Sequence, residues 1–285
     1  MSVAESPITT SGYIPVEGGR LYYESIGRGY PLVLLHAGIA HLRMWDDQVP
    51  ALSAHFRVIR YDLRGFGRSI DAAAPFAHVA DLLAVLDSLG LVRARLLGCS
   101  KGAGISLDFA VAHPDRVSAL VLVGGAPTGY EGTSGPPRQW DEMVVAYKAG
   151  DFDRAAELET QIWFDGASRA PEQMDSAVRE RVRAMDRQAL EREALNDAHT
   201  QPAAPNIERL AEVQVPVLVL VGDLDDPDLV AAAGYMAARF PQGQHATLPG
   251  TAHLPNLEQP ETFNRLVLDF LTRLPGKMGV PAGRA

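Results

Sequence analysis

Apolar residues are grouped along the chain in short runs that end at glycine or at a polar residue. The run "PLVLLHAG" at 31–38 is continuous, which is typical of a strand buried on both faces of a sheet. Similar runs recur at intervals long enough to hold a helix between them. We therefore predict strands at 31–38, 56–62, 94–100, 117–125, 216–223 and 244–250.

The segments between these runs carry apolar residues at helical spacing. The clearest is 78–90, which ends at Gly90, a residue common just after a helix. Strand–helix–strand order at this spacing favours right-handed crossovers and parallel pairing. We expect an α/β fold with a mostly parallel central sheet of about eight strands flanked by helices. The other predicted helices are 44–53, 101–114, 227–240 and 260–273.

Two regions depart from this alternation. Near the start, "VEGG" at 16–19 separates two strand-like runs and predicts a β-hairpin. Between about 126 and 211 the chain has helical signal, clearest at 180–196, and no convincing strand. The simplest interpretation is one α/β domain, formed by 1–125 and 208–285, with a helical insertion at 126–207.

Composition limits the partners that we expect. The 285 residues carry a formal net charge of -9 and 47% apolar residues, so the chain buries a large core. Nucleic acid and anionic membranes reward basic patches, and neither is an expected partner. The single cysteine, Cys99, permits no intramolecular disulfide, and the polar start shows no signal peptide. We expect a cytoplasmic protein that acts on a small molecule, with a homodimer possible.

A serine stands between two glycines where the predicted strand 94–100 meets the predicted helix 101–114. Gly98-Cys99-Ser100-Lys101-Gly102 fits the pattern G-x-S-x-G. This pattern in this context is typical of a strained corner that exposes the serine hydroxyl. Small residues are needed two positions on either side because strand and helix approach closely. Ser100 is therefore the candidate nucleophile.

A serine hydroxyl needs a base, and the base needs an orienting acid. His253 follows the predicted strand 244–250, so it reaches the same edge of the sheet as Ser100. His36 also ends a strand, but we expect it to have a structural role. Four aspartates follow the strand 216–223, and Asp225 is the preferred acid because of its position in the loop. The other aspartates of that loop are Asp223, Asp226 and Asp228.

Acyl transfer also needs N–H donors for the negative charge that develops on the carbonyl oxygen. The backbone N–H of Lys101, at the start of a helix, is one candidate. The loop "HAGIA" at 36–40 supplies the other, with Gly38 as the expected donor.

These segments together resemble the α/β-hydrolase family from about Tyr13 to Leu274. The motifs that carry the resemblance are "HAGIA", "YDLRGFGRS" (61–69), "GCSKG", "GDLDDPD" (222–228) and "GTAHLPNLEQP" (250–260). The resemblance implies Ser100 as nucleophile, Asp225 as acid, His253 as base and the insertion 126–207 as a cap over the pocket. Within the family the chain looks most similar to small esterases and enol-lactonases.

The chain departs from the family pattern at three positions. Ala37 and Ala103 stand where glycine is common, which leaves the backbone donors unaffected. Lys101 stands where a neutral residue is usual. Its ammonium either extends to water or a nearby acid, or attracts a substrate carboxylate.

The cap segment contains three aromatic residues, Trp140, Trp163 and Phe164. One interpretation is that they line an apolar substrate-binding site. The alternative is that they pack the cap onto the main domain.

We therefore expect a serine hydrolase that cleaves an ester or lactone, with neither cofactor nor metal. Activity is expected to fall at acidic pH as His253 becomes protonated. The same three residues also serve C–C hydrolysis, perhydrolysis or lyase chemistry in an alternative interpretation. A further alternative is a receptor-like protein that binds a ligand with little turnover.

Overall fold

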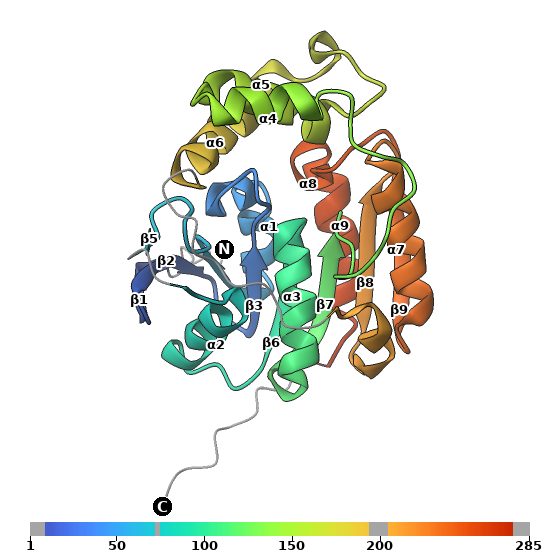
Figure 1. The fold of residues 1–285 in the computed structure, drawn as a ribbon. Coiled ribbons are helices and arrows are strands. Elements are labelled where there is room, and N and C mark those ends of the chain that lie inside the picture. Colours follow the sequence, from blue (N-terminus) through green and yellow to red (C-terminus); the bar gives the residue numbers. More distant parts are fainter. Residues whose placement is uncertain (1–8, 72–74, 194–204, 276–285) are drawn as a thin grey trace, which may run out of the picture.

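The computed structural model describes residues 9–71, 75–193 and 205–275. The first residues of the polar start (1–8) and the end of the helix predicted at 180–196 lie outside the described residues. Figure 1 shows a central sheet with helices on both faces and a group of helices above one end.

A sheet of eight strands in the order β1-β2-β4-β3-β6-β7-β8-β9 forms the centre of the described part of the chain, and a two-residue strand, β5, pairs with β2. β1 and β2 form an antiparallel hairpin, β2 pairs antiparallel with β4, and the pairs from β4 to β9 are parallel. The predicted α/β fold with a mostly parallel sheet is confirmed. The strands are β1 (Thr9–Val16), β2 (Gly19–Ile26), β3 (Tyr30–Leu35), β4 (Phe56–Tyr61), β5 (Ile70–Asp71), β6 (Ala94–Cys99), β7 (Val117–Val123), β8 (Val217–Gly222) and β9 (Gly243–Leu248).

Two helical layers cover the two faces of this sheet. One hydrophobic cluster joins the strands to α2, α3 and α7, and another joins them to α1 and α9. The described helices are α1 (Val49–Ser53), α2 (His78–Ser88), α3 (Lys101–Ala112), α4 (Trp140–Lys148), α5 (Phe152–Thr160), α6 (Ser176–Glu193), α7 (Pro227–Arg239), α8 (Pro255–Glu258) and α9 (Pro260–Leu271).

Strand β8 shows why the central strands are rich in apolar residues. Val217, Val219 and Val221 belong to the cluster on one face of the sheet. Leu218 and Leu220 belong to the cluster on the other face. Side chains alternate between the faces of a strand, so a strand covered on both sides needs an uninterrupted apolar run.

The single helix predicted at 44–53 is wrong, because the structure divides this segment into two short pieces. A 3₁₀ turn, η1, spans Leu42–Trp45, and α1 begins only at Val49. Pro50 lies in the first turn of α1 and has no N–H to donate, so it fits the start of a helix but not the interior of a longer one.

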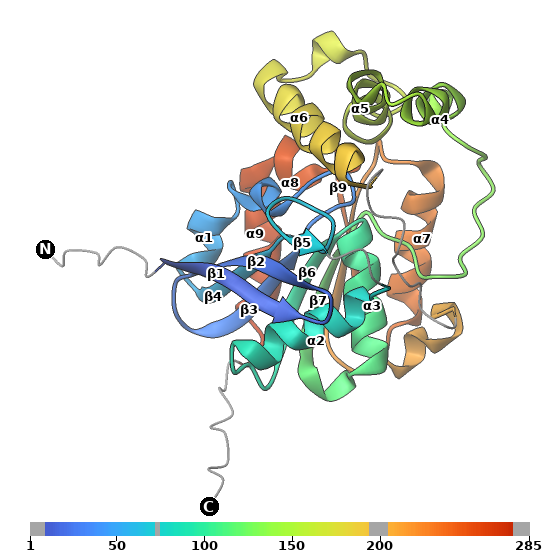
Figure 2. The ribbon, with the colours of Figure 1, turned by 60° about the vertical axis from the view of Figure 1, so that its left-hand side comes forward.

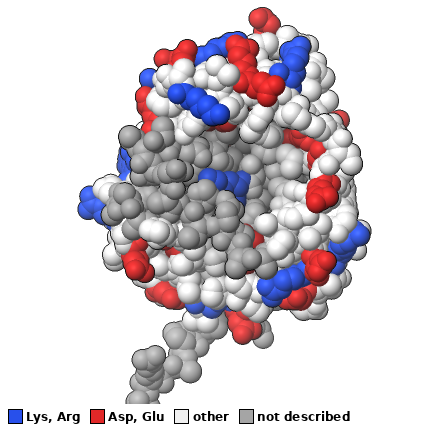
Figure 3. Space-filling model, viewed as in Figure 1, with Lys and Arg blue, Asp and Glu red and all other residues white. Residues whose placement is uncertain are grey.

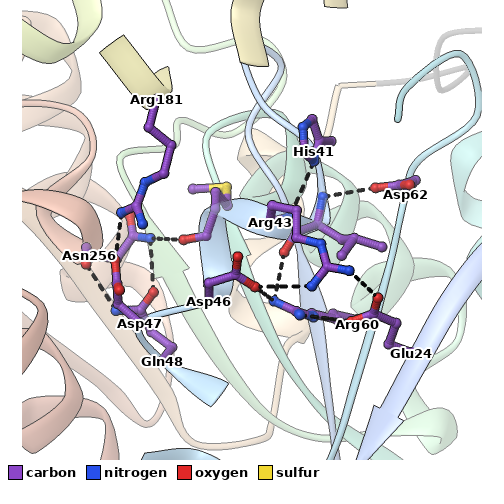
Figure 4. A network of polar contacts seen from close by, with 12 residues as sticks. Glu24, His41, Arg43, Asp46, Asp47, Gln48, Arg60, Asp62, Arg181 and Asn256 are labelled. Atoms are coloured by element: carbon purple, nitrogen blue, oxygen red, sulfur yellow. Dashed lines mark hydrogen bonds and ion pairs between the residues drawn. The ribbon is translucent and has the colours of Figure 1, made fainter. Parts of the chain in front are cut away.

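Helices α4, α5 and α6 follow β7 and precede β8 in the chain, and they lie together above one end of the sheet (Figures 1 and 2). We call these helices and the turns between them the cap. The cap has a small apolar cluster of its own, which includes Met143, Ala155, Leu158 and Leu190. An ion pair of 2.6 Å between Arg181 of α6 and Asp47 joins the cap to the α/β domain (Figure 4).

Within the described ranges, none of the helices has the length and apolar character needed to cross a membrane. Acidic and basic side chains are interspersed on the face of the molecule seen in Figure 3.

Candidate active site

Ser100 occupies the corner between β6 and α3. Its backbone has φ 52° and ψ −116°, and among the described residues it is the one non-glycine residue with a positive φ. Its N–H donates to the carbonyl oxygen of Val123 in β7 (2.8 Å), which fixes the corner to the neighbouring strand. A non-glycine residue held in such a sparsely populated backbone conformation marks a site where the fold imposes strain, as in a strained nucleophile turn.

Close backbone approach explains the glycines on either side of this serine. A Cβ at Gly98 would collide with the carbonyl group of Gly102. A Cβ at Gly102 would collide with the carbonyl oxygen of Leu35 in β3. Each obstacle is backbone and has little freedom to move, so the G-x-S-x-G pattern follows from the packing of α3 against β3 and β6.

His253 and Asp225 meet in the loops that follow β9 and β8. The imidazole Nδ1 lies 3.0 Å from each carboxylate oxygen of Asp225. Both side chains are buried, with 4% of the His253 side chain and 1% of the Asp225 side chain exposed. An Asp225 carboxylate accepting from Nδ1–H leaves Nε2 as the ring nitrogen that is free to take a proton.

The three other aspartates of the Asp225 loop bond to backbone groups. Asp223 accepts from the N–H of Gly250 (2.6 Å). Asp226 caps α7 by accepting from the N–H of Asp228 (2.8 Å). Asp228 accepts from two backbone N–H groups of the segment before α4. Among these four acids, the structure therefore brings Asp225 to the histidine.

His36 is unavailable as a base, because backbone groups engage both of its ring nitrogens. Nδ1 donates to the carbonyl oxygen of Ala37 (2.8 Å), and Nε2 accepts from the N–H of Leu63 (2.9 Å). The ring is fully buried, and burial lowers the pKa of His36 from 6.5 to about 3. The neutral ring ties the 36–40 loop to the end of β4.

This buried histidine predicts a loss of stability in acid. In the unfolded chain His36 gains a proton below pH 6.5, whereas in the folded chain it stays neutral down to about pH 3. Stability is therefore present above pH 6.5 and is lost as pH falls below it, by about 2 kcal/mol from this group at pH 5. We expect the free energy of unfolding, measured with urea, to fall more steeply from pH 6.5 to pH 5 in the wild type than in His36→Gln.

The exposed residue His55 provides the control, since His55→Gln removes a histidine that lacks a buried environment. If the free energy of unfolding fell equally steeply with pH in the wild type and in His36→Gln, the acid loss of stability would not come from His36. Burial raises the pKa of Asp62 to about 6, so this carboxyl adds stability as pH falls from 6.5 to 5. It does so in the wild type and in both variants.

A cavity of about 220 Å³ lies between the Ser100 corner and the cap. It brings together the predicted residues Ser100, His253, Gly38, Lys101, Trp140 and Trp163. Phe164 is not among the described residues that line it. Its side chain is 1% exposed and belongs to the apolar cluster that also contains Val182 and Leu254, which joins the cap to the domain below.

The Trp163 ring stacks obliquely on the imidazole of His253, with ring centroids 4.8 Å apart and 41° between the planes. The Lys101 alkyl chain runs beside Gly38, where an added Cβ would lie 3.8 Å from the Cβ of Lys101. The Lys101 ammonium lies over the ring of Phe66, 4.9 Å from its centroid. This placement is consistent with the apolar stem lining the cavity while the charge is directed to its side.

A family model for the alpha/beta hydrolase fold matches residues 30–260, which include the Ser100, Asp225 and His253 segments. The chain belongs to the α/β-hydrolase family.

The relatives of this hydrolase are named for several different reactions. It is 28% identical to pimeloyl-[acyl-carrier protein] methyl ester esterase of Yersinia enterocolitica, over 88% of this chain and 97% of the relative. It is 30% identical to a 2-hydroxy-6-oxononadienedioate/2-hydroxy-6-oxononatrienedioate hydrolase of Burkholderia vietnamiensis, over 95% and 99%. The crystal structure of the enol-lactonase from Burkholderia xenovorans superposes with a TM-score of 0.76 at 28% identity, over 92% of this chain and all of the other.

Sequence reasoning missed the acidic wall of the hydrolase's cavity. Glu159 of α5 and Asp186 of α6 line it, together with Ala189 and Leu190. Asp186, Ala189 and Leu190 are spaced i, i+3 and i+4, so they share one face of α6. The available signal was an aspartate on a stripe that is otherwise apolar, and Asp186 is only 1% exposed.

A partly buried ionic network fixes the turn that follows Gly38 in this hydrolase (Figure 4). Arg60 forms ion pairs with Glu24 (2.7 Å) and with Asp46 (2.6 Å). Asp62 accepts from the N–H of Leu42 (2.8 Å). These contacts hold the 41–46 turn, and hence the end of the 36–40 loop, against β2 and β4.

Apart from this site, the described residues form other cavities but no group that could hold a metal ion. A larger cavity of about 830 Å³ lies at the opposite edge of the sheet, lined by residues that include Arg57, Arg93 and Arg95, and it contains none of the predicted site residues. Among the described residues, no group of three or more histidine, cysteine or acidic side chains is arranged to hold a metal ion.

Proposed function

We propose that the protein is a serine hydrolase that cleaves a carboxylic ester or lactone with Ser100, His253 and Asp225. The observation that carries the proposal is the shared cavity. A serine on a strained corner and a histidine paired with a buried aspartate at 3.0 Å both line it. A hydroxyl, an imidazole and a carboxylate in this order are the parts of nucleophilic acyl transfer.

In the proposed acylation, Nε2 of His253 takes the hydroxyl proton of Ser100 as Oγ attacks the carbonyl carbon. The carbonyl oxygen gains negative charge, and the N–H groups of Gly38 and Lys101 stabilise it. The N–H of Lys101 belongs to the first turn of α3, where backbone donors have no partner within the helix. The C–O bond to the leaving group then breaks, and the imidazolium returns its proton to the departing oxygen.

Deacylation repeats these steps with water. His253 removes a proton from the water as its oxygen attacks the acyl carbon, and the tetrahedral intermediate collapses to the acid and free Ser100. Asp225 keeps the proton on Nδ1 throughout and stabilises the imidazolium. Trp140 and Trp163 supply apolar surface to the bound acyl or alcohol group.

Hydrolysis of a C–C bond is the second candidate. The relative that is 30% identical over 95% of this chain is named a 2-hydroxy-6-oxononadienedioate/2-hydroxy-6-oxononatrienedioate hydrolase, and in this chain the same three residues would serve C–C hydrolysis. Analysis of products from a vinylogous diketone acid and from a simple ester separates the two. C–C hydrolysis yields two products that were joined by a C–C bond in the substrate, whereas ester hydrolysis breaks a C–O bond and yields an acid and an alcohol.

We further infer a small-molecule substrate, rather than nucleic acid or a membrane, and a cytoplasmic location. The net charge of -9 and the single, buried Cys99 support these inferences.

A fluorophosphonate probe tests the proposal. The expected result is one phosphonyl adduct per chain, located by peptide mass spectrometry at Ser100, because an activated serine attacks the phosphorus and displaces fluoride. The adduct should block hydrolysis of p-nitrophenyl acetate in proportion to labelling. An unlabelled Ser100 in a protein that still hydrolyses this ester would exclude the proposed nucleophile.

A further inference from the structure

The cap bonds directly to the loop that carries His253. A single π-helical turn, η3 (Gln161–Asp165), follows α5. The carbonyl oxygen of Trp163 in this turn accepts from the backbone N–H of His253 (3.2 Å). Isolated π turns are rare in proteins, and those that occur are often found at functional sites. Here the turn joins the cap to the histidine's own backbone.

Arg169 makes a second connection, a few residues after this turn. Its Nη1 donates to the carbonyl oxygen of Gly250 (3.0 Å) and pairs with Glu258 of α8 (2.6 Å). Glu258 in turn accepts from the N–H of Ala252 through its other oxygen (2.7 Å). The loop 250–253 is therefore held at Gly250, at Ala252 and at His253.

The rest of the Arg169 guanidinium is anchored within the cap. Nε donates to the carbonyl oxygen of Asp165 (2.7 Å), and Nη2 donates to that of Phe164 (2.7 Å). One planar group thus spans the π turn on one side and the His253 loop on the other. A lysine, with a single ammonium, lacks the geometry for all of these bonds.

Gly166 closes the connection between the cap and both catalytic loops. It has φ 75°, and a Cβ there would lie 2.9 Å from the carbonyl oxygen of Leu224 and 3.2 Å from the Cβ of Ala252. Leu224 precedes Asp225 and Ala252 precedes His253. The cap backbone is therefore wedged between the loop of the acid and the loop of the base.

The Arg169–Glu258 pair is screened from water. The exposed fractions of the side chains are 15% and 5%. Burial raises the pKa of Glu258, and the Arg169 charge opposes that rise. Removing one partner of such a pair leaves the other charge buried and uncompensated, so the loop that depends on it has to rearrange.

We propose that Arg169 is a positioning residue that holds the imidazole of His253 in register with Ser100 through Glu258 and the 250–253 loop. The inference rests on the proposed role of His253. It makes the cap part of the catalytic framework, because the 163–169 segment cannot leave the domain without releasing the histidine loop.

The test compares Arg169→Met with Arg181→Met. The Arg181–Asp47 pair is a second cap-to-domain ion pair of 2.6 Å, but it joins α6 to the segment after η1 and is more exposed, at 34% and 37%. We expect Arg169→Met to lower kcat for p-nitrophenyl acetate by about 10²-fold with little change in KM, because a displaced base costs rate rather than binding. Arg181→Met should stay within about threefold of the wild type. Arg169→Lys should recover part of the loss.

A pH profile separates positioning from a loosened cap. Without Arg169, Glu258 is protonated at a higher pH, and protonation weakens its bond to the Ala252 N–H in the His253 loop. The acid limb of kcat/KM should therefore move up by about half a pH unit or more. The limb should not move in Arg181→Met. Equal kcat values and an unmoved limb in a folded Arg169→Met, judged by its circular dichroism and melting temperature, would overturn the proposal.

An NMR measurement keeps this inference distinct from the proposed function. The downfield proton on Nδ1 of His253 reports its bond to Asp225 in the absence of turnover. It should broaden or shift in Arg169→Met and not in Arg181→Met. If Ser100→Ala keeps its activity, the proposed function fails, and the NMR result still decides whether Arg169 holds the histidine.

Discussion

Replacing Ser100 with alanine is expected to lower kcat for p-nitrophenyl acetate on the order of 10⁶-fold, to the rate set by the remaining binding site. The alanine removes the oxygen that would form the acyl bond, and the cavity offers no second hydroxyl among the described residues that line it. His253 and Asp225 would remain paired but would have no nucleophile to activate. Initial rates over a range of substrate concentrations, against an enzyme-free blank, give the comparison.

Ser106 in the same helix provides the matched control. Its hydroxyl is buried and donates to the carbonyl oxygen of Gly102 (2.7 Å), away from the cavity lining. Ser106→Ala removes one hydroxyl from α3 and should leave kcat within a few-fold of the wild type. If both variants retained near wild-type rates, nucleophilic catalysis by Ser100 would be excluded. A large loss in both would point to disruption of α3 instead.

The sheet could be predicted from sequence because its strands are buried on both faces. In β6 and β8 every residue is buried, so the apolar runs mark these strands to within one or two residues at either end. Strand β5 was missed because two residues carry no periodicity. Its pairing with β2 depends on the path of the chain around it rather than on its own composition.

The convergence of the candidate site was also predictable, since loops after parallel strands leave the same edge of the sheet. The sequence placed Ser100, His253 and one of four aspartates at that edge. Which aspartate reaches the ring depends on the direction of each side chain in one short loop. The hydrogen bonds of Asp223 and Asp226 to backbone groups give a physical reason why those two are occupied elsewhere.

The cap was the least predictable part, because its side-chain directions depend on how it docks. Trp163 and Phe164 are adjacent in sequence, yet the first lines the cavity and the second packs into the core. The π turn that contains both sets these directions, and no local pattern announced it. The contacts of Arg169 likewise join residues 81 and 89 positions apart.

Replacing Asp225 with asparagine is expected to lower kcat on the order of 10⁴-fold while leaving the fold intact. The asparagine amide has nearly the same shape, but its NH₂ group donates where the carboxylate accepts. The neutral imidazole would then place its proton on Nε2, so the nitrogen proposed to take the Ser100 proton could no longer do so. The loss of a buried charge 3.0 Å from the ring also removes the stabilisation of the imidazolium.

Asp226→Asn is the control for this change, because it makes the same substitution at the next residue. Asp226 caps α7, and asparagine is an equally good N-cap, so activity and melting temperature should both be preserved. Kinetics from pH 5 to pH 9 provide the measurement. If the wrong imidazole tautomer causes the loss of kcat in Asp225→Asn, the loss persists at the high pH values where the histidine is neutral. An Asp225→Asn variant within tenfold of the wild type across that range would mean that His253 is oriented by its loop contacts and by Trp163 rather than by the carboxylate.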